Sequence, residues 1–134
     1  MSRKMFHKKI AGCVIIENNK VLLIKKKTNN WFELPGGTIE PEETPEQTAR
    51  REMKEEICCE VEIISLYQEK EFHHKEKLYH GTWFLAKIKE GQKPSIGEPE
   101  EYSELAFIAL ENLSSIAISP NVEEMLANLE ISRA

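Results

Sequence analysis

The sequence of 134 residues contains no aspartate, few cysteines and no long apolar run. None of its apolar stretches approaches the roughly 18 residues that a membrane span needs, and residues 1–6 lead into no apolar segment typical of a signal peptide. The three cysteines, two of them adjacent as Cys58 and Cys59, form neither a disulfide framework nor a CxxC zinc motif. We therefore expect a protein that spans no membrane and works in the reducing cytoplasm.

Internal repeats, low-complexity tracts and linkers rich in Gly, Pro and Ser are also absent, so the sequence offers no boundary between domains. Hydrophobic residues make up 40% of the chain. A chain of this length buries roughly two thirds of its unfolded surface, which is enough for a core. We expect one domain over residues 1–134.

All 23 acidic residues are glutamates, and charge is distributed unevenly along the chain. Residues 1–27 carry eight lysines and arginines against one glutamate, whereas residues 28–60 carry nine glutamates against three basic residues. A protein with a net charge of −5 and one basic segment is a poor candidate for binding the phosphate backbone of duplex nucleic acid. It can still hold a small phosphorylated ligand.

Most of the apolar segments have the β-branched composition and length of strands. Residues 10–16 and 21–24 predict a β-hairpin, because the intervening residues 17–20 include an Asn pair that tolerates a tight turn. Pro35-Gly36-Gly37 forces a turn after a short apolar piece at residues 31–34. Further strands are predicted at 61–67, 78–88 and 106–110, the first two flanking a charged stretch at 69–77. Together they predict a mixed sheet.

Two helices are predicted. Thr44-Pro45-Glu46-Gln47 combines a threonine N-cap, proline at the first helical position and a glutamine that completes a capping box. A second helix is predicted after Ser119-Pro120-Asn121, because residues 122, 125, 126 and 129 are apolar at helical spacing.

Glutamates gather on one side of the helix at 44–57. At roughly 100° per residue, Glu52, Glu55 and Glu56 share a face, and an apolar stripe of Ala49, Met53 and Ile57 runs beside them. Like charges at these spacings destabilise a helix. The pattern fits either a solvated acidic face neutralised by nearby basic residues or a site for Mg²⁺ or Mn²⁺, since carboxylates are hard ligands.

Seven residues stand at the spacings of a known signature: Gly37, Glu43, Arg51, Glu52, Met53, Glu55 and Glu56. They resemble the Nudix box, G-x5-E-x7-R-E-U-x-E-E-x-G-U, where U is apolar. The preceding Leu34-Pro35-Gly36-Gly37 is similar to the usual entrance of that box. One position departs, since Cys58 replaces the glycine expected after the helix, where a residue with a Cβ in left-handed conformation costs about 1 kcal/mol.

The resemblance implies the Nudix fold, an α/β/α sandwich with a mixed sheet packed between helices. It implies a cofactor, Mg²⁺ with Mn²⁺ as an alternative, held by Glu52, Glu55 and Glu56 and by the carbonyl group of Gly36. Of these carboxylates we take Glu52 as the base that removes a proton from the attacking water.

The same resemblance implies an ion pair between Glu43 and Arg51 that holds the loop against the helix. Gly37 belongs to the structural part of the box. Arg51 and a further carboxylate from the loop before the last strand complete the expected catalytic set. In that loop we select Glu101, ahead of Glu100, as an additional metal ligand.

Substrate contacts are expected outside the box. Lys25 and Lys26 end the second predicted strand, where MutT-like members place a phosphate-binding arginine. Asn121 resembles the base-reading asparagine of MutT-type enzymes, and an amide suits this task because it both donates and accepts hydrogen bonds. Phe84, with Trp83 and Tyr79 on the same strand, is a candidate for stacking on a base, although strand aromatics are more often part of a core.

The implied activity is Mg²⁺-dependent hydrolysis of a pyrophosphate linkage in a nucleoside diphosphate joined to a group X. Nucleoside triphosphates, oxidised purine ones included, are the first substrate class, with a monophosphate and pyrophosphate as products. A dinucleoside polyphosphate or ADP-sugar pyrophosphatase and a nucleotide-sensing module without turnover are the alternatives. We expect a nucleotide as partner, with no duplex nucleic acid and no membrane; the oligomeric state is not readable, and a dimer stays open.

Overall fold

The computed structural model describes residues 5–28, 30–119 and 122–127. Its elements, in chain order, are β1 (Lys8–Glu17), β2 (Lys20–Lys26), β3 (Phe32–Glu33), β4 (Gly36–Thr38), α1 (Pro45–Ile57), β5 (Val61–His74), β6 (Lys77–Ile88), β7 (Tyr102–Ala109) and the 3-10 helix η1 (Leu110–Ser115). Residues 122–127 are helical as well. No helix within these ranges is long and apolar enough to cross a membrane.

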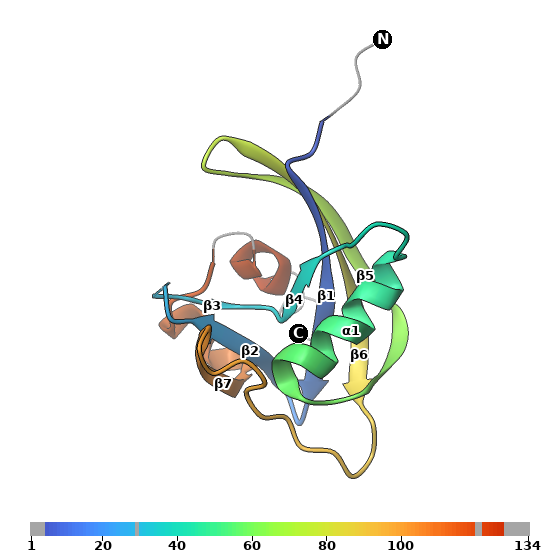
Figure 1. Ribbon diagram of the computed structural model, residues 1–134. Coiled ribbons are helices and arrows are strands. Elements are labelled where there is room, and N and C mark those ends of the chain that lie inside the picture. The colour runs from blue at the N-terminus through green and yellow to red at the C-terminus, as the bar shows by residue number, and fades with distance from the viewer. Residues whose placement is uncertain (1–4, 29, 120–121, 128–134) are drawn as a thin grey trace.

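The strands form one mixed sheet of seven, in the order β3-β2-β1-β6-β5, with β4 paired to β1 and β7 paired to β2 (Figure 1). β1 is central, because it runs parallel to β6 and antiparallel to both β2 and β4. This arrangement brings the double glycine of β4 next to the middle of β1, where Gly37 pairs with Ala11 and Gly36 with Gly12.

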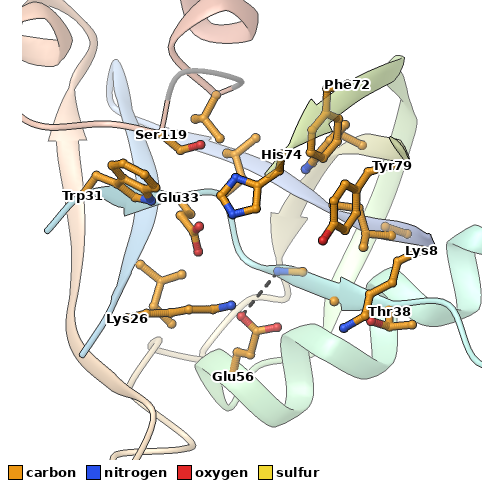
Figure 2. Close-up of a pocket in the computed structure, with 18 of the residues that line it drawn as sticks. Lys8, Lys26, Trp31, Glu33, Thr38, Glu56, Phe72, His74, Tyr79 and Ser119 are labelled. Atoms are coloured by element: carbon orange, nitrogen blue, oxygen red, sulfur yellow. Dashed lines mark hydrogen bonds between the residues drawn. The ribbon is translucent and has the colours of Figure 1, made fainter. Parts of the chain in front are cut away.

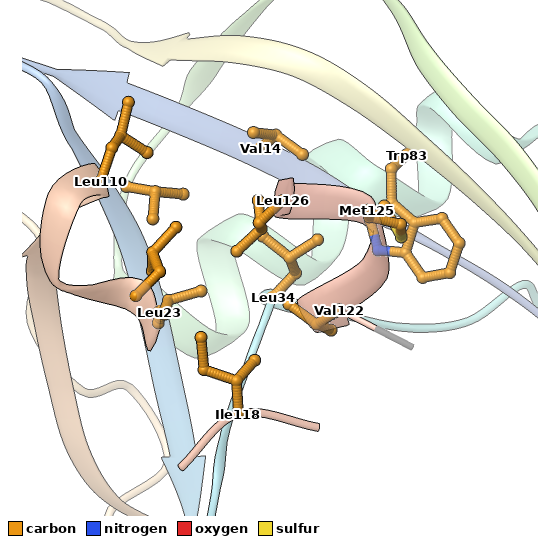
Figure 3. Packing of buried hydrophobic residues seen from close by; sticks show 11 residues of the cluster. Val14, Leu23, Leu34, Trp83, Leu110, Ile118, Val122, Met125 and Leu126 are labelled. Carbon is orange, nitrogen blue, oxygen red and sulfur yellow. The ribbon is translucent and has the colours of Figure 1, made fainter. Parts of the chain in front are cut away.

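Alternating residues of β1 divide the core into two clusters, because successive side chains of a strand point to opposite faces. Cys13 and Ile15 pack with α1 on one face. Val14 packs on the other with Met125 and Leu126 of the C-terminal helical stretch, as Figure 3 shows. The sheet therefore lies between helices, and the mixed sheet and layered architecture predicted from the sequence are confirmed.

The predicted start and end of the first helix are confirmed in detail. The Thr44 side chain accepts a hydrogen bond from the Gln47 N–H, and the Gln47 side chain accepts one from the Thr44 N–H. Cys58 takes the left-handed conformation with φ 58° and donates its N–H to the carbonyl of Met53. It therefore caps the helix in the conformation that the missing glycine would adopt without strain.

The first hairpin is also confirmed, with Asn18 and Asn19 at positive φ in its turn. The predicted end of the strand at residues 61–67 is wrong. Instead of ending before the charged stretch at 69–77, β5 and β6 run through it and meet at Lys75 and Glu76, both left-handed. The hairpin extends beyond the rest of the sheet (Figure 1). β7 begins at Tyr102, four residues earlier than predicted.

Candidate active site

The three glutamates of α1 lie on the predicted face but differ in exposure. The apolar stripe beside them is fully buried, since Ala49 and Met53 have no exposed surface. Glu56 is 1% exposed, whereas the side chains of Glu52 and Glu55 are 13% and 46% exposed. The helix thus places one carboxylate inside the protein, one at its edge and one in solvent.

Arg51 joins the loop before α1 to two of these glutamates. Its Nε and Nη2 donate to the two oxygens of Glu43 at 2.7 and 3.0 Å. Its Nη1 donates to Glu52 Oε1 at 3.0 Å and to Glu55 at 3.2 Å, and Nη2 also reaches the carbonyl of Thr38 at 3.2 Å. The hydrogen bonds from Arg51 are the main reason that the pKa of Glu43 falls to about 2. The ion pair between Glu43 and Arg51 lies where the resemblance placed it.

The double glycine of β4 lies directly against the helix glutamates. The N–H of Gly36 donates to Glu56 Oε1 at 3.4 Å. A Cβ atom on Gly37 would overlap the carboxylate of Glu52, so a larger residue there would displace that side chain. β4 therefore presents its backbone to Glu52 and Glu56, two of the three helix carboxylates that the sequence selects.

Glu56 has an unfavourable environment for a negative charge. Its Oε2 makes no geometric hydrogen bond among the described residues, and the nearby Tyr102 hydroxyl, which lowers the pKa of Glu56, offsets the burial only in part. Burial and the adjacent carboxylate of Glu52 raise the pKa of Glu56 far above its ordinary value. A buried carboxylate beside another one is stable in its ionised form only when a cation is nearby.

The loop before β7 closes the C-terminal end of α1. The N–H groups of Ser95 and Gly97 donate to the carbonyls of Ile57 and Glu56 at 3.0 and 2.9 Å. A Cβ on Gly97 would overlap the backbone of the helix, so the loop depends on glycine for this contact. These bonds satisfy helix carbonyls that would otherwise lack partners.

Glu98 follows this anchor and is a candidate site residue that the sequence reading did not select. Its pKa is raised by partial burial and then by the negative charges of Glu101, Glu55 and Glu52. Glu101, which the sequence reading selected, is exposed. Its backbone carbonyl accepts a hydrogen bond from the N–H of Lys27 at 2.9 Å. Only the hydrogen bonds between the loop and α1, which the sequence does not reveal, distinguish the two positions.

A cavity of about 450 Å³ opens beside these groups, within the usual range for small-ligand sites. Figure 2 shows Lys26 and Glu56 at one end, with aromatic walls formed by Trp31 on one side and by Phe72 and Tyr79 on the other. The Phe72 and Tyr79 rings are stacked, with centroids 5.4 Å apart. Such a cavity joins a charged end to a planar apolar slot.

The structure separates the predicted substrate-binding residues. Lys26 lines the cavity, and so does Lys8, which the sequence reading did not select. The amino group of Lys25 lies instead 6.0 Å from the centre of the Phe32 ring. Phe84 packs against the α1 side of the sheet and does not line the cavity, since Trp83 holds that place.

Asn121, the predicted base-reading residue, lies outside the described residues. Two histidines that the sequence reading did not select, His73 and His74, line the cavity from the end of β5. The ring of His74 packs edge-on against Tyr79 with centroids 6.2 Å apart.

The glutamates of α1 are the candidate cation ligands of this site. Within the described ranges no three His, Cys, Asp or Glu side chains converge on one point, because Arg51 holds Glu52 and Glu55 together on one side. The unpaired, buried oxygen of Glu56 beside Glu52 nevertheless calls for positive charge. Carboxylate oxygens are the ligands that Mg²⁺ and Mn²⁺ prefer, so the donor set fits such an ion.

A mixed sheet between helices, with a glutamate-bearing helix packed on a double-glycine strand, is the arrangement of the Nudix fold. The chain belongs to the Nudix family, because the family model for the NUDIX domain matches residues 6–129. A crystal structure of a MutT NUDIX hydrolase from Burkholderia pseudomallei superposes with a TM-score of 0.81, covering 90% of this chain and 95% of that one at 23% identity.

Three curated relatives differ in how much of each protein is matched. The 8-oxo-dGTP diphosphatase of Escherichia coli is 28% identical over 90% of this chain and 93% of its own length. A MutT-like protein of Streptomyces ambofaciens is 42% identical over 42% of this chain, and the ADP-ribose pyrophosphatase of Methanocaldococcus jannaschii is 48% identical over 48% of it. These two matches span only 37% and 40% of the relatives' length.

Proposed function

We propose that this protein hydrolyses a pyrophosphate linkage in nucleotides and that Mg²⁺, replaceable by Mn²⁺, is its cofactor. The observation that carries the proposal is the buried carboxylate of Glu56, which lacks a partner on one oxygen and lies at the charged end of a nucleotide-sized cavity. Glu52, Glu55 and Glu56 would hold the ion, with the Gly36 carbonyl and a carboxylate of the loop before β7. When bound, the ion supplies positive charge for the phosphate oxygens.

The chain's own residues account for the other steps. Lys26 and Lys8 neutralise non-bridging phosphate oxygens, because phosphoryl transfer depends mostly on positioning and charge. Glu52 removes the proton of the attacking water, whose oxygen bonds to phosphorus as the P–O bond to the leaving pyrophosphate or nucleotide breaks. In the loop before β7, Glu98 joins Glu101 as a candidate for the additional carboxylate, since its pKa responds to the charges of Glu52 and Glu55.

Nucleoside triphosphates, oxidised purine ones included, are the substrate class that we place first. The aromatic walls suit a planar base, and Trp31 offers a buried indole N–H without a partner among the described residues. The E. coli relative that matches along nearly its whole length is named an 8-oxo-dGTP diphosphatase. We further propose a cytoplasmic location and a single domain over the chain.

ADP-ribose is the second candidate, because the relative with 48% identity over its matched stretch is named an ADP-ribose pyrophosphatase. A sensing module that binds nucleotides without turnover is the alternative from a different class. The cluster of Glu52, Glu55 and Glu56 on α1 argues against it, since binding alone needs no such cluster of carboxylates.

A substrate panel tests the proposal. The purified protein is incubated with 8-oxo-dGTP, dGTP, ADP-ribose and diadenosine tetraphosphate, with Mg²⁺ or with EDTA, and the products are identified by chromatography. We expect release of a nucleoside monophosphate and pyrophosphate from a triphosphate only when Mg²⁺ is present. Binding that raises the melting temperature without any product would show a sensor instead.

A matched pair of variants tests the substrate end of the cavity. Lys26→Ala should raise KM by about tenfold, because a charge-assisted phosphate contact is worth about 1.4 kcal/mol. Lys25→Ala, one residue away but directed to the Phe32 ring, should leave KM within about twofold. Equal effects of the two substitutions would contradict the assignment of Lys26.

A further inference from the structure

Thr48 is a polar residue with no exposed surface on α1. It occupies one of the positions that the Nudix box leaves free. A buried threonine in a helix usually returns its hydroxyl to a carbonyl of the preceding turn. Here the hydroxyl donates instead to Glu43 Oε1 at 2.7 Å, outside the helix. The hydrogen bond joins the core side of α1 to the loop before it.

This bond is the first in a continuous series that ends at the helix glutamates. Glu43 Oε1 also accepts the N–H of Glu40 at 3.1 Å. The Glu43 carboxylate then receives the fork of Arg51 at 2.7 and 3.0 Å, and the remaining nitrogen of that fork contacts Glu52 and Glu55. Thr48 therefore lies three contacts from the carboxylates proposed to hold the cation.

Arg51 has several acidic neighbours and can be drawn toward any of them. Its guanidinium lies 3.7 Å from Glu40, in addition to its bonds with Glu43, Glu52 and Glu55. A Glu43 carboxylate that is fixed by Thr48 keeps Nε and Nη2 of Arg51 on the loop side, so that only Nη1 contacts Glu52 and Glu55. Without that support the cation of Arg51 is freer to settle on Glu52 and Glu55, where it competes with a metal ion for the same oxygens.

We infer that Thr48 is a positioning residue: its buried hydroxyl fixes Glu43, which occupies Nε and Nη2 of Arg51 and leaves only Nη1 to pair with the metal-binding glutamates. The inference rests on the proposed function, because it assigns those glutamates to a divalent cation. It gives a role in cation affinity to a threonine that touches neither the cavity nor the carboxylates of α1.

Mn²⁺ alone is the probe, measured by electron paramagnetic resonance on metal-free protein without substrate. Thr48→Val and Thr48→Ala both remove the hydroxyl, one keeping the volume and the other reducing it, whereas Thr48→Ser keeps it. Replacing a residue that contacts a metal ligand typically weakens metal binding 10- to 100-fold, and Thr48 is two contacts further out than such a residue, so we expect Val and Ala to weaken Mn²⁺ binding by roughly three- to tenfold. Serine should restore the affinity to within about twofold of the original.

Thr82→Val is the matched control, because Thr82 is also a buried threonine but lies on β6. It should leave the Mn²⁺ affinity unchanged, and circular dichroism should show all four variants folded. Steady-state kinetics give a second readout. With Mg²⁺ well below saturation, the Thr48→Val and Thr48→Ala variants should turn over nucleotide more slowly than the unmodified protein, and excess Mg²⁺ should restore their rate. The KM for nucleotide should stay constant.

The outcomes separate two failures. If the unmodified protein binds Mn²⁺ and hydrolyses nucleotides but folded Val and Ala variants bind Mn²⁺ equally well, the role of Thr48 is refuted and the proposed function stands. If Thr82→Val weakens binding as much as Thr48→Val, the effect is a general loss of packing and the inference is again refuted. If the unmodified protein neither binds Mn²⁺ nor turns over nucleotide, the proposed function fails, and this inference fails with it.

Discussion

Replacing Glu56 with glutamine should make the metal-free protein more stable and the enzyme less active. Glutamine has the shape of glutamate but cannot ionise, so it removes the repulsion with Glu52 and keeps the contact with the Gly36 N–H. Each pKa unit corresponds to about 1.4 kcal/mol, and a buried unpaired carboxylate costs several kcal/mol. We therefore expect the free energy of unfolding at pH 8 in EDTA to rise by about 2 kcal/mol, which is a shift of roughly 8 °C in Tm.

The pH dependence has a definite sign. Because the pKa of Glu56 is raised in the folded protein, the folded state holds this proton over a pH range in which the unfolded chain has lost it. The stability contribution of the protonated group is thus complete below about pH 4.5 and is lost as the pH rises above it. The glutamine variant lacks this loss, so its advantage in Tm should be large at pH 8 and small at pH 5.

Activity should change in the opposite direction. Loss of one carboxylate ligand should lower kcat by about 100- to 10,000-fold with saturating nucleotide and Mg²⁺. Glu46→Gln, on the exposed first turn of the same helix, is the control and should leave both Tm and kcat almost unchanged. The reasoning is refuted if Glu56→Gln melts below the unmodified protein at pH 8 in EDTA, or if its kcat stays within threefold.

Two further predictions concern glycine. Cys58→Gly should raise the free energy of unfolding by about 1 kcal/mol in urea titrations, because the left-handed conformation at φ 58° strains a residue with a Cβ; an unchanged midpoint would argue against strain at this cap. Gly81→Ala should destabilise the protein by about 2 kcal/mol and raise KM, because the new Cβ would overlap the indole of Trp83 and push it into the cavity. Calorimetry and steady-state kinetics check the second prediction, and an unaltered KM would show that Trp83 does not shape the substrate slot.

The sequence predicted α1 and its site face well because local signals decide them. The capping box and the proline fix where the helix starts, and the spacing of Ala49, Met53 and Ile57 fixes which side is buried. Once that side is buried, the positions of Glu52 and Glu56 follow from helix geometry.

Other features depend on contacts between distant segments and were not readable. The tip of the β5–β6 hairpin extends beyond the rest of the sheet (Figure 1) and is largely exposed, so burial imposes no apolar pattern on it and its charged residues do not look like a strand. Whether Trp83 or Phe84 faces the cavity depends on the register of β6 against β1, which pairs Trp83 with Gly12. The place of Glu98 depends in the same way on the bonds between its loop and the end of α1.

The account rests most directly on a divalent cation at the glutamates of α1. A crystal soaked in Mn²⁺ and measured at a wavelength with strong manganese anomalous scattering tests it. The account predicts an anomalous peak bonded to carboxylate oxygens of Glu52 and Glu56, at roughly the 2.0–2.2 Å expected for a small hard cation. A map without a peak at these side chains, with Arg51 still bound to Glu52 and Glu55 at high Mn²⁺ concentration, would contradict it.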